Sequence, residues 1–485
     1  MGSFRDLIRW PLSVSLLVLL FLSTQCFCLI NQHASNHKQL HALQVEVSTL
    51  LPPHAQYSCK PSPSPKGMKS KRGNSLEVRH RHGACGESRR PSHEEILEQD
   101  KARVESIKGR VKPKLVDTDR IRQKAVGLPA KPGSTVGSGN YIVTLGLGTP
   151  KKDLSLIFDT GSDFTWTQCA PCTKSCYKQK EPVFDPSASS TYSNVTCTSP
   201  LCSEVRAATS TDPGCSGSTC VYGIQYGDSS FSVGFFAKDT LSLGSDVDTV
   251  PNFLFGCGEN NQGLFGGSAG LLGLGRNKFS AVSQTASKYG TYFSYCLPSK
   301  TTSTGHLTFG KGGTFAKEMK YTSLLSSSQG PSFYFVELQG ISVGGNKLTI
   351  SPTVFTTAGT VIDSGTVITR LPPDAYSALQ GAFSKLMSNY PEAPALSILD
   401  TCYDFSSHAT VTVPKISLLF SGGAELDLQL PGIFYVKDIT QVCLAFAGND
   451  DAGDVAILGN VQQLTFDVVY DVAAGKLGFG PGGCA

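Results

Sequence analysis

The sequence predicts an all-β protein of two related lobes, with a cleft between them and a few short helices. Only 16% of the residues are charged while 50 are Gly, a composition that suits turn-rich β structure better than helix bundles. From about residue 140 onward, short β-branched and aromatic runs alternate with Gly, Pro, Asn and Ser. The 485 residues are also too many for one simple core.

A weak internal repeat divides this body into two halves. Residues 156–162 read Leu-Ile-Phe-Asp-Thr-Gly-Ser, and residues 360–366 read Thr-Val-Ile-Asp-Ser-Gly-Thr. About a hundred residues after each comes an apolar-apolar-Gly element, at 271–273 and at 457–459. A lone Asp-Thr-Gly is usually a plain turn, but two copies with the same flanks indicate two related lobes. We expect an N-terminal lobe at 136–328 and a C-terminal lobe at 329–485.

The chemistry of the repeat points to Asp159 and Asp363 as a catalytic pair. Two carboxylates a few ångströms apart cannot comfortably both ionise, so the pair shares one proton at acidic pH. The ionised carboxylate can accept a proton from a water held between the two, while the protonated one donates to a scissile carbonyl. The sequence therefore predicts peptide hydrolysis with no metal and no other cofactor.

The residues that follow each Asp suit this role. The glycines allow a tight turn and close backbone approach. The first hydroxyl of each motif could bond across the two loops, and the second could donate to the carboxylate. These supporting residues are Thr160, Gly161, Ser162, Ser364, Gly365 and Thr366.

The stretch from Asp159 to Cys172, Asp-Thr-Gly-Ser-Asp-Phe-Thr-Trp-Thr-Gln-Cys-Ala-Pro-Cys, resembles the pepsin-like aspartic proteases of the plant nepenthesin type. A cysteine-rich insert at 169–220 strengthens the likeness, which covers about residues 140–485. Within this group the chain most resembles the apoplastic and chloroplast-nucleoid DNA-binding branch. The resemblance implies a bilobal double β-barrel, an aspartic endopeptidase acting on polypeptides, and a monomer.

The resemblance also assigns roles to other residues. Tyr226 matches the Tyr of the flap that closes over substrate, and Trp166 matches the Trp that hydrogen-bonds it. Ser229 stands where the flap motif usually has Gly, which leaves flap mobility and fine specificity open. The implied disulfides are Cys169–Cys172, Cys176–Cys257, Cys197–Cys220, Cys202–Cys215, Cys296–Cys484 and Cys402–Cys443.

The N-terminal region differs from the body in charge. Residues 1–131 hold 22 Lys/Arg and 11 Asp/Glu, a net charge of +11, whereas residues 132–485 have a net charge of −7. Residues 1–28 read as a secretory signal, because a basic start precedes an apolar run too short to span a membrane. Residues 29–135 then form a basic segment in which residues 94–111 could be an exposed helix.

Three interpretations of this basic segment stay open. A propeptide could lie across the acidic cleft at neutral pH, loosen at low pH and be removed near residues 125–138. The Lys/Arg clusters could instead bind nucleic acid. The segment could also be a solvated stretch without a partner.

Cysteine usage supports secretion. Twelve of the 16 Cys lie in the body, and an even dozen indicates six disulfides in an oxidising compartment. Asn194 is in an N-glycosylation sequon, which only a secreted chain could use. A zinc site at Cys169 and Cys172 is disfavoured because the sequence has no second Cys or His pair at metal-binding spacing to complete it. We expect the apoplast as destination, with vacuole or plastid as alternatives.

Two rival functions remain at this point. A catalytically silent relative could act as a binding protein or as an inhibitor of carbohydrate-active enzymes. A glycosidase could use two carboxylates, but the symmetric Asp-Thr/Ser-Gly pair argues against it.

Overall fold

The computed structural model describes residues 41–50, 74–81, 91–111 and 141–484, apart from 228, 245–247, 264, 301–302 and 312–317. Strands dominate, and the described helices are short except for α2 (His93–Val111) and α8 (Pro373–Met387), which confirms the all-β prediction. The predicted signal at 1–28 and the predicted processing region at 125–138 lie outside the described residues. Within the described part, no helix is long and apolar enough to cross a membrane.

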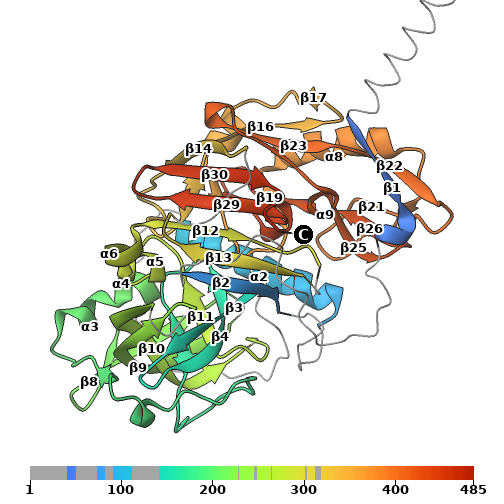
Figure 1. The fold of residues 1–485 in the computed structure, drawn as a ribbon. Coiled ribbons are helices and arrows are strands. Elements are labelled where there is room, and N and C mark those ends of the chain that lie inside the picture. The colour runs from blue at the N-terminus through green and yellow to red at the C-terminus, as the bar shows by residue number, and fades with distance from the viewer. Residues whose placement is uncertain are drawn as a thin grey trace, which may run out of the picture.

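Two β-rich lobes stack one above the other in Figure 1, the N-terminal lobe in green and the C-terminal lobe in orange and red. Through Leu325 the body contains β3 (Tyr141–Leu147), β4 (Lys152–Asp159), β5 (Trp166–Gln168), η2 (Pro186–Ala188), β6 (Ser193–Asn194), α3 (Pro200–Glu204), α4 (Arg206–Thr209), β7 (Gly214–Ser216), β8 (Thr219–Gln225), β9 (Phe231–Ser242), β10 (Thr249–Gln262), β11 (Gly270–Gly273), α5 (Ala281–Gln284), α6 (Ala286–Tyr289), β12 (Tyr292–Cys296), β13 (Thr304–Phe309) and β14 (Lys320–Leu325).

The second half repeats this density of short strands and adds helix α8. It contains β15 (Tyr334–Val336), β16 (Leu338–Val343), β17 (Asn346–Lys347), α7 (Thr353–Thr356), β18 (Thr360–Ile362), β19 (Thr369–Leu371), α8, β20 (Glu392–Ala393), β21 (Cys402–Tyr403), β22 (Thr410–Pro414), β23 (Ile416–Phe420), η3 (Ser421–Gly423), β24 (Glu425–Asp427), α9 (Leu430–Ile433), β25 (Phe434–Asp438), β26 (Gln441–Leu444), β27 (Phe446–Gly448), β28 (Ala456–Leu458), η4 (Asn460–Gln463), β29 (Phe466–Asp471) and β30 (Lys476–Pro481).

The internal repeat is visible as the same strand pairing in each lobe. Strand β11 runs parallel to β4, with Leu272 opposite Phe158. Strand β28 runs parallel to β18 in the same way, with Ile457 opposite Val361. These apolar strands are buried, as parallel strands covered on both faces usually are. Each apolar-apolar-Gly element therefore supports the strand that ends at one of the two aspartates.

One sheet connects the two lobes, in the strand order β3-β2-β13-β12-β29-β30-β14. Its strands come from both ends of the chain, because β29 and β30 return to pair with β12 and β14. Strand β2 (Ser75–His80), from the basic N-terminal segment, lies between β3 and β13. Strand β2 is thus an integral part of this sheet.

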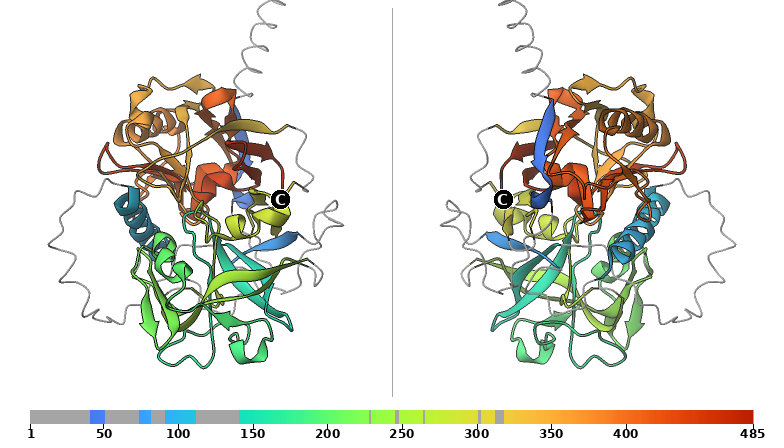
Figure 2. Two further views of the ribbon diagram at one scale, coloured as in Figure 1. Left: turned by 90° about the vertical axis from the view of Figure 1, so that its left-hand side faces the viewer. Right: turned by 90° about the vertical axis from the view of Figure 1, so that its right-hand side faces the viewer.

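The other described parts of that segment, residues 41–50 and 91–111, pack on the C-terminal lobe and between the lobes. Strand β1 (Ala42–Glu46) pairs with β22 and is followed by η1 (Val47–Thr49). Helix α2, light blue in Figure 2, lies at the boundary of the two lobes. The helix expected at 94–111 is therefore present but not exposed, since Leu97, Val104 and Ile107 are buried.

The predicted disulfide pairing is partly wrong. Cys296–Cys484 and Cys402–Cys443 form as the resemblance implies. Cys169–Cys172 and Cys176–Cys257 do not form; Cys169 instead bonds Cys257, and Cys172 bonds Cys176. The reason is strand register: β5 runs parallel to β10 with Thr167 opposite Cys257, and Cys169 follows β5 directly, where its N–H donates to the Gly258 carbonyl at 2.8 Å. Cys172 and Cys176 then face each other within one loop.

The second exchange occurs in the β7–β8 hairpin. Instead of the predicted Cys197–Cys220 and Cys202–Cys215, the bonds are Cys197–Cys215 and Cys202–Cys220. Cys215 and Cys220 lie directly opposite each other on β7 and β8, so spacing along the chain cannot distinguish the two pairings. Burial distinguishes the two pairings, because Cys202 and Cys220 are both in the core whereas Cys215 is exposed.

This arrangement allows a matched stability test. Both bonds close loops with a sequence separation of 18, so the chain-entropy gain of about 3 kcal/mol is the same for each. Replacing Cys202 and Cys220 by Ala should lower the free energy of unfolding by about 1–2 kcal/mol more than replacing Cys197 and Cys215, because only the first pair leaves a cavity. Urea unfolding under oxidising conditions measures both. Equal losses of unfolding free energy would contradict the assignment of Cys202–Cys220 as the buried bond of the two.

Candidate active site

Asp159 and Asp363 meet at the boundary between the lobes. Asp159 is the last residue of β4, and Asp363 follows β18 directly. Both side chains are buried, with 1% and 0% of their surface exposed. Leu274 N–H donates to the Asp159 carbonyl at 2.9 Å, and Asp363 N–H donates to the Leu458 carbonyl at 3.1 Å. The parallel pairing in each lobe thus fixes the backbone under each carboxylate.

The first hydroxyl of each motif bonds across the two loops, as predicted. The Ser364 hydroxyl accepts from Thr160 N–H at 3.1 Å, and the Thr160 hydroxyl accepts from Ser364 N–H at 2.9 Å. All four groups are buried, and buried bonds of this kind rigidify a site. The two lobes are therefore held together at the point where the carboxylates approach.

The two glycines are required by this close approach. A Cβ atom on Gly161 would lie 2.6 Å from Asp363 Oδ1, and one on Gly365 would lie 2.6 Å from Asp159 Oδ1. Each glycine N–H also donates to the Asp two residues earlier, at 3.0 Å for Gly161 and 3.1 Å for Gly365. Each carboxylate is thus held by its own loop and packed against the glycine of the other.

The second hydroxyls behave differently in the two motifs. Thr366 Oγ1 donates to Asp363 Oδ2 at 2.6 Å, as expected from the sequence. The Ser162 hydroxyl and Asp159 Oδ2 form no hydrogen bond of good geometry with the described residues, although Ser162 contributes to the lowered pKa of Asp159. The pair is therefore symmetric in its backbone support but not in its outer donors.

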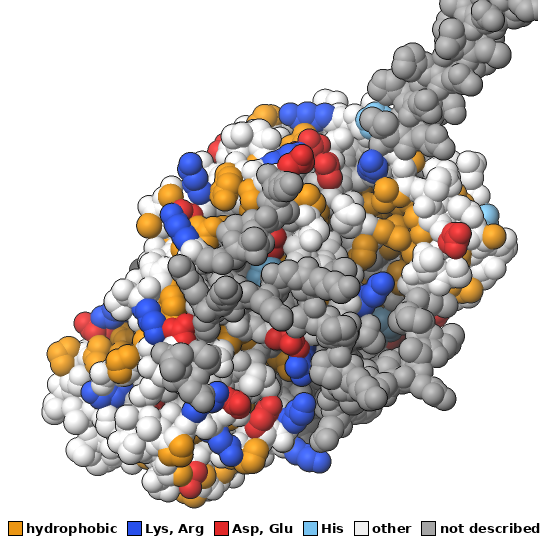
Figure 3. Space-filling view, in the orientation of Figure 1, with side chains coloured by type: hydrophobic (Ala, Val, Ile, Leu, Met, Phe, Trp, Pro, Cys, Tyr) orange, Lys and Arg blue, Asp and Glu red, His pale blue; other side chains and the backbone are white. Residues whose placement is uncertain are grey.

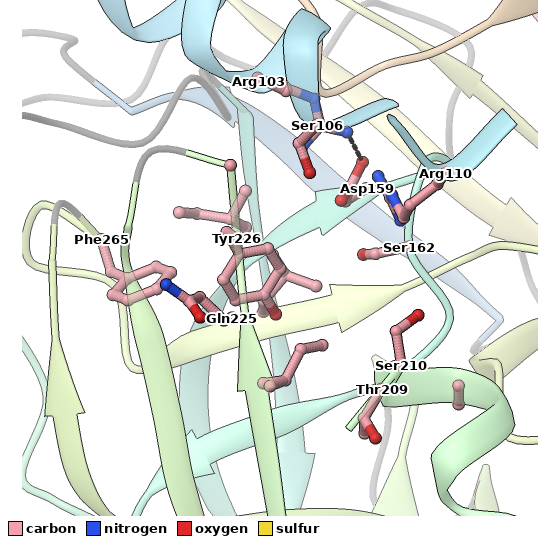
Figure 4. A pocket seen from close by; sticks show the side chains of 15 residues that line it. Arg103, Ser106, Arg110, Asp159, Ser162, Thr209, Ser210, Gln225, Tyr226 and Phe265 are labelled. Carbon is pink, nitrogen blue, oxygen red and sulfur yellow. Dashed lines mark hydrogen bonds and ion pairs between the residues drawn. The ribbon is translucent and has the colours of Figure 1, made fainter. Parts of the chain in front are cut away.

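Arg103, which the sequence interpretation did not identify, lies between the two carboxylates. Its Nη2 donates to Asp159 Oδ1 at 2.5 Å and to Asp363 Oδ2 at 2.9 Å, and its Nε donates to Asp363 Oδ2 at 3.0 Å. The side chain comes from α2 and is 14% exposed (Figure 4). The available signal was the helical spacing of Leu97, Val104 and Val111, which predicts a buried face close to this arginine.

The electrostatics of the pair follow from burial and from this cation. Burial opposes ionisation of Asp159 most strongly, but Arg103, Ser162 and the Gly161 N–H together outweigh it and lower the Asp159 pKa. Burial raises the pKa of Asp363; Arg103 offsets part of this rise, and the negative charge of Asp159 adds to it. The two carboxylates raise the pKa of Arg103 further, so it stays charged.

Tyr226 and Trp166 form the predicted contact. Trp166 Nε1 donates to the Tyr226 hydroxyl at 2.8 Å, and Phe265 packs against both rings. The loop that carries Tyr226 closes through Tyr226 N–H to the Ser230 carbonyl at 2.8 Å. Ser229 has a φ of 66°, a left-handed conformation that favours glycine, so the departure from the usual Gly falls where a side chain is strained.

A pocket lies beside Asp159, between this loop, helix α4 and helix α2 (Figure 4). Its walls combine apolar side chains with a few hydroxyls, as ligand sites usually do. The apolar lining residues include Ile157, Ala208, Ile224, Phe265 and Leu271.

The remaining sequence-predicted sites are also located. Asn194 is on β6 and is exposed, and its side-chain oxygen accepts from the Tyr192 hydroxyl at 2.6 Å. Within the described ranges, no cluster of three or more His, Cys, Asp or Glu side chains is arranged to hold a metal ion.

Two family models match the body of the chain. The xylanase inhibitor N-terminal model covers residues 141–311, and the xylanase inhibitor C-terminal model covers residues 333–481. Among solved structures, basic 7S globulin from soybean superposes with a TM-score of 0.56 at 23% identity, over 70% of this chain and 91% of the globulin. This likeness shows the fold, with its two pepsin-like lobes.

Curated relatives are more similar in sequence. An aspartyl protease family protein of Arabidopsis thaliana is 53% identical over 476 residues, which is 97% of this chain and 99% of the relative. Aspartyl protease AED1 of the same plant is 50% identical over 95% of this chain and 96% of its own length. Aspartic proteinase nepenthesin-2 of Nepenthes gracilis is 38% identical over 72% of this chain and 78% of its own length. The chain therefore belongs to the pepsin-like aspartyl protease family, in the plant group that includes the nepenthesins.

Proposed function

We propose that this chain is a secreted aspartic endopeptidase that is made as an inactive precursor and cleaves polypeptides at acidic pH through Asp159 and Asp363. The observation that carries the proposal is the meeting of two buried carboxylates across the lobe boundary, each backed by its own glycine turn. The six disulfides suit the oxidising compartment that secretion provides.

The proposed reaction uses the pair as one acid–base unit. With the cleft open, the two carboxylates share a proton and hold a water between them. The ionised carboxylate takes a proton from this water as its oxygen attacks the scissile carbonyl carbon, and the protonated carboxyl donates to the carbonyl oxygen. When the C–N bond breaks, the leaving nitrogen receives a proton from the pair. The cross-loop bonds of Thr160 and Ser364 keep the two groups aligned throughout.

The pocket beside Asp159 favours large apolar side chains in the substrate. Its apolar lining would bury such a side chain next to the reacting bond. Tyr226, which also lines this pocket, would cover the bound peptide, positioned by its hydrogen bond to Trp166.

Helix α2 supports the precursor proposal, because it occupies the space that a substrate needs. Arg103 engages both carboxylates, and Arg110 Nη1 donates to the Gly161 carbonyl at 3.1 Å. The helix also touches the loop of Tyr226: a Cβ atom on Gly227 would collide with Ser106 and with the Ala102 carbonyl. A peptide could not reach the pair until α2 leaves.

The two aspartates act in opposite directions: the lowered Asp159 pKa weakens the closed state in acid, whereas the raised Asp363 pKa strengthens it. We base acid opening on Asp159, whose carboxylate is the ionised partner of Arg103. The Asp159 pKa is lowered in the closed state, so its pairing with Arg103 stabilises that state fully above the ordinary Asp pKa of about 4 and is lost below it. A hydrogen bond from Lys437 lowers the pKa of the exposed Glu94 to about 2, and this contact also weakens as pH falls from about 4.5 towards 2. We expect the precursor to stay closed at neutral pH and to open below about pH 4.

Cleavage of a denatured protein tests the proposed function directly. Purified full-length chain should cut such a substrate at about pH 3–5, and a statine-type peptide inhibitor should block the cut. N-terminal sequencing of the mature secreted protein should find its first residue near 125–138. A mature protein that retains residues 66–124 would contradict the precursor proposal, and absence of acid cleavage would contradict the protease itself.

The bond between Trp166 and Tyr226 gives a further prediction. Trp166→Phe should lower kcat/KM for a peptide about fivefold, since a hydrogen bond of this kind contributes about 1 kcal/mol. Tyr226→Phe removes the same bond, so the double variant should lose little more than either single variant. Steady-state kinetics of the three variants measure this, and fully additive losses would show that the two residues act separately.

Two alternatives make different predictions. The family models carry the name of xylanase inhibitors, and a catalytically silent relative would show no acid cleavage.

A nucleic-acid function would need a continuous basic surface. On the face drawn in Figure 3, Lys and Arg of the described residues are interspersed with Asp and Glu, which favours neither a basic band nor a phosphate-binding groove there.

A further inference from the structure

Asp100, a carboxylate residue of helix α2, is buried against the C-terminal lobe. Asp100 is 0% exposed and accepts from Val367 N–H at 2.5 Å and from Ile368 N–H at 3.1 Å. Arg370 Nη2 lies 3.0 Å from Asp100 Oδ2. Two backbone N–H donors, one to each oxygen, and an ion-paired guanidinium thus surround one carboxylate, an arrangement that matches its charge and its two oxygens.

The three donors belong to the body of the chain and are held rigidly there. The Val367 carbonyl accepts from Val461 N–H at 3.2 Å, and the Ile368 carbonyl accepts from Arg370 Nη1 at 2.8 Å. Arg370 is 4% exposed, and among the described residues Asp100 is its one carboxylate partner. The donors therefore keep their positions whether or not α2 is present.

The donors and the catalytic pair contact the same helix. Asp100 and Arg103 are three residues apart on α2, so their side chains lie on one face of the helix. Their axial separation is about 4.5 Å, which corresponds to one or two residues of an extended peptide at about 3.3 Å each. When α2 leaves, two backbone N–H groups and Arg370 lose their partner, and buried donors without partners are costly.

We propose that Val367 N–H, Ile368 N–H and Arg370 form a carboxylate-binding subsite that selects an Asp or Glu side chain of the substrate close to the scissile bond. This inference rests on the proposed function and names part of its substrate class. In the precursor, Asp100 occupies the subsite as an internal mimic of that side chain.

A peptide series tests the subsite in the enzyme that acid activation produces from the full-length chain, after α2 has been removed. One Asp is moved through the four positions on each side of a single apolar scissile bond, and each peptide is paired with its Asn counterpart. At pH 5, we expect kcat/KM to be about tenfold higher for Asp than for Asn at one position. The preference should fade as pH falls below about 4, because the substrate carboxyl becomes protonated.

Variants then locate the preference at Arg370. Arg370→Gln should reduce the Asp/Asn ratio at that position to about one, and Arg370→Lys should retain part of it. Asp100→Asn removes the internal mimic and should leave the ratio of the activated enzyme as it is. The wild-type ratio needs no variant, so the test holds even if Arg370→Gln fails to fold.

The outcomes separate this inference from the proposed function. Cleavage of the peptides with no Asp preference at any position, or a preference that survives in Arg370→Gln, would overturn the subsite and leave the protease intact; in that case Arg370 serves only to anchor the precursor helix. Cleavage of no peptide at all would contradict the proposed function itself.

Discussion

Replacing Asp363 by Asn is expected to lower kcat/KM for peptide cleavage by about 10³-fold or more without unfolding the protein. The amide oxygen can still accept from Gly365 N–H, and the amide NH2 that replaces Oδ2 can donate to the Thr366 hydroxyl. It cannot share a proton with Asp159, so the acid–base unit is lost. The variant cannot activate itself, and a site for an added protease within 125–138 would allow its processing.

Stability provides the second readout for this variant. In the processed enzyme, the change removes one of two buried like charges, so the melting temperature should stay the same or rise. Asp427→Asn on β24 is the matched control, because this exposed Asp lies outside the cleft and should keep wild-type activity. A processed Asp363→Asn enzyme that cleaves at more than a tenth of the wild-type rate would contradict the proposed mechanism.

The features that the sequence predicted well are local and repeated. Each Asp motif is a short strand followed by a glycine turn. Each apolar-apolar-Gly element pairs with the strand of the Asp motif that precedes it in the chain. The bonds between Thr160 and Ser364 follow once two such turns face each other. These inferences needed only the order of the motifs along the chain, because each half of the repeat contains one Asp motif and one apolar-apolar-Gly element.

The features that it missed depend on register between distant segments. Cys169 pairs with Cys257 because of the alignment of β5 with β10, which spacing along the chain does not determine. Arg103 is one of many basic residues in its segment, and only the docking of α2 between the lobes distinguishes it from an exposed Arg. The same holds for Asp100, whose partners lie more than 260 residues away.

Replacing Arg103 by Met should make the uncleaved precursor expose its catalytic pair. The change leaves two buried carboxylates without their cation, and breaking a buried pair in this way costs about 3–5 kcal/mol. The ratio of open to closed chains should therefore rise by about 10²–10⁴-fold. Binding of a statine-type inhibitor to the uncleaved chain measures the opening, and gel analysis of the same sample confirms that the chain is intact.

The pH dependence of opening should also reverse in this variant. In the wild type, Arg103 lowers the Asp159 pKa, so acid weakens the closed state. Without Arg103, burial and mutual repulsion raise the pKa of both aspartates in the closed state, which is then stable only while they are protonated and opens as pH rises. Arg79→Gln on β2 is the control, because this Arg is 46% exposed and pairs only with Glu77 among the described carboxylates. If the intact Arg103→Met chain resists the inhibitor at pH 6 as the wild type does, then contacts other than Arg103 keep the cleft closed.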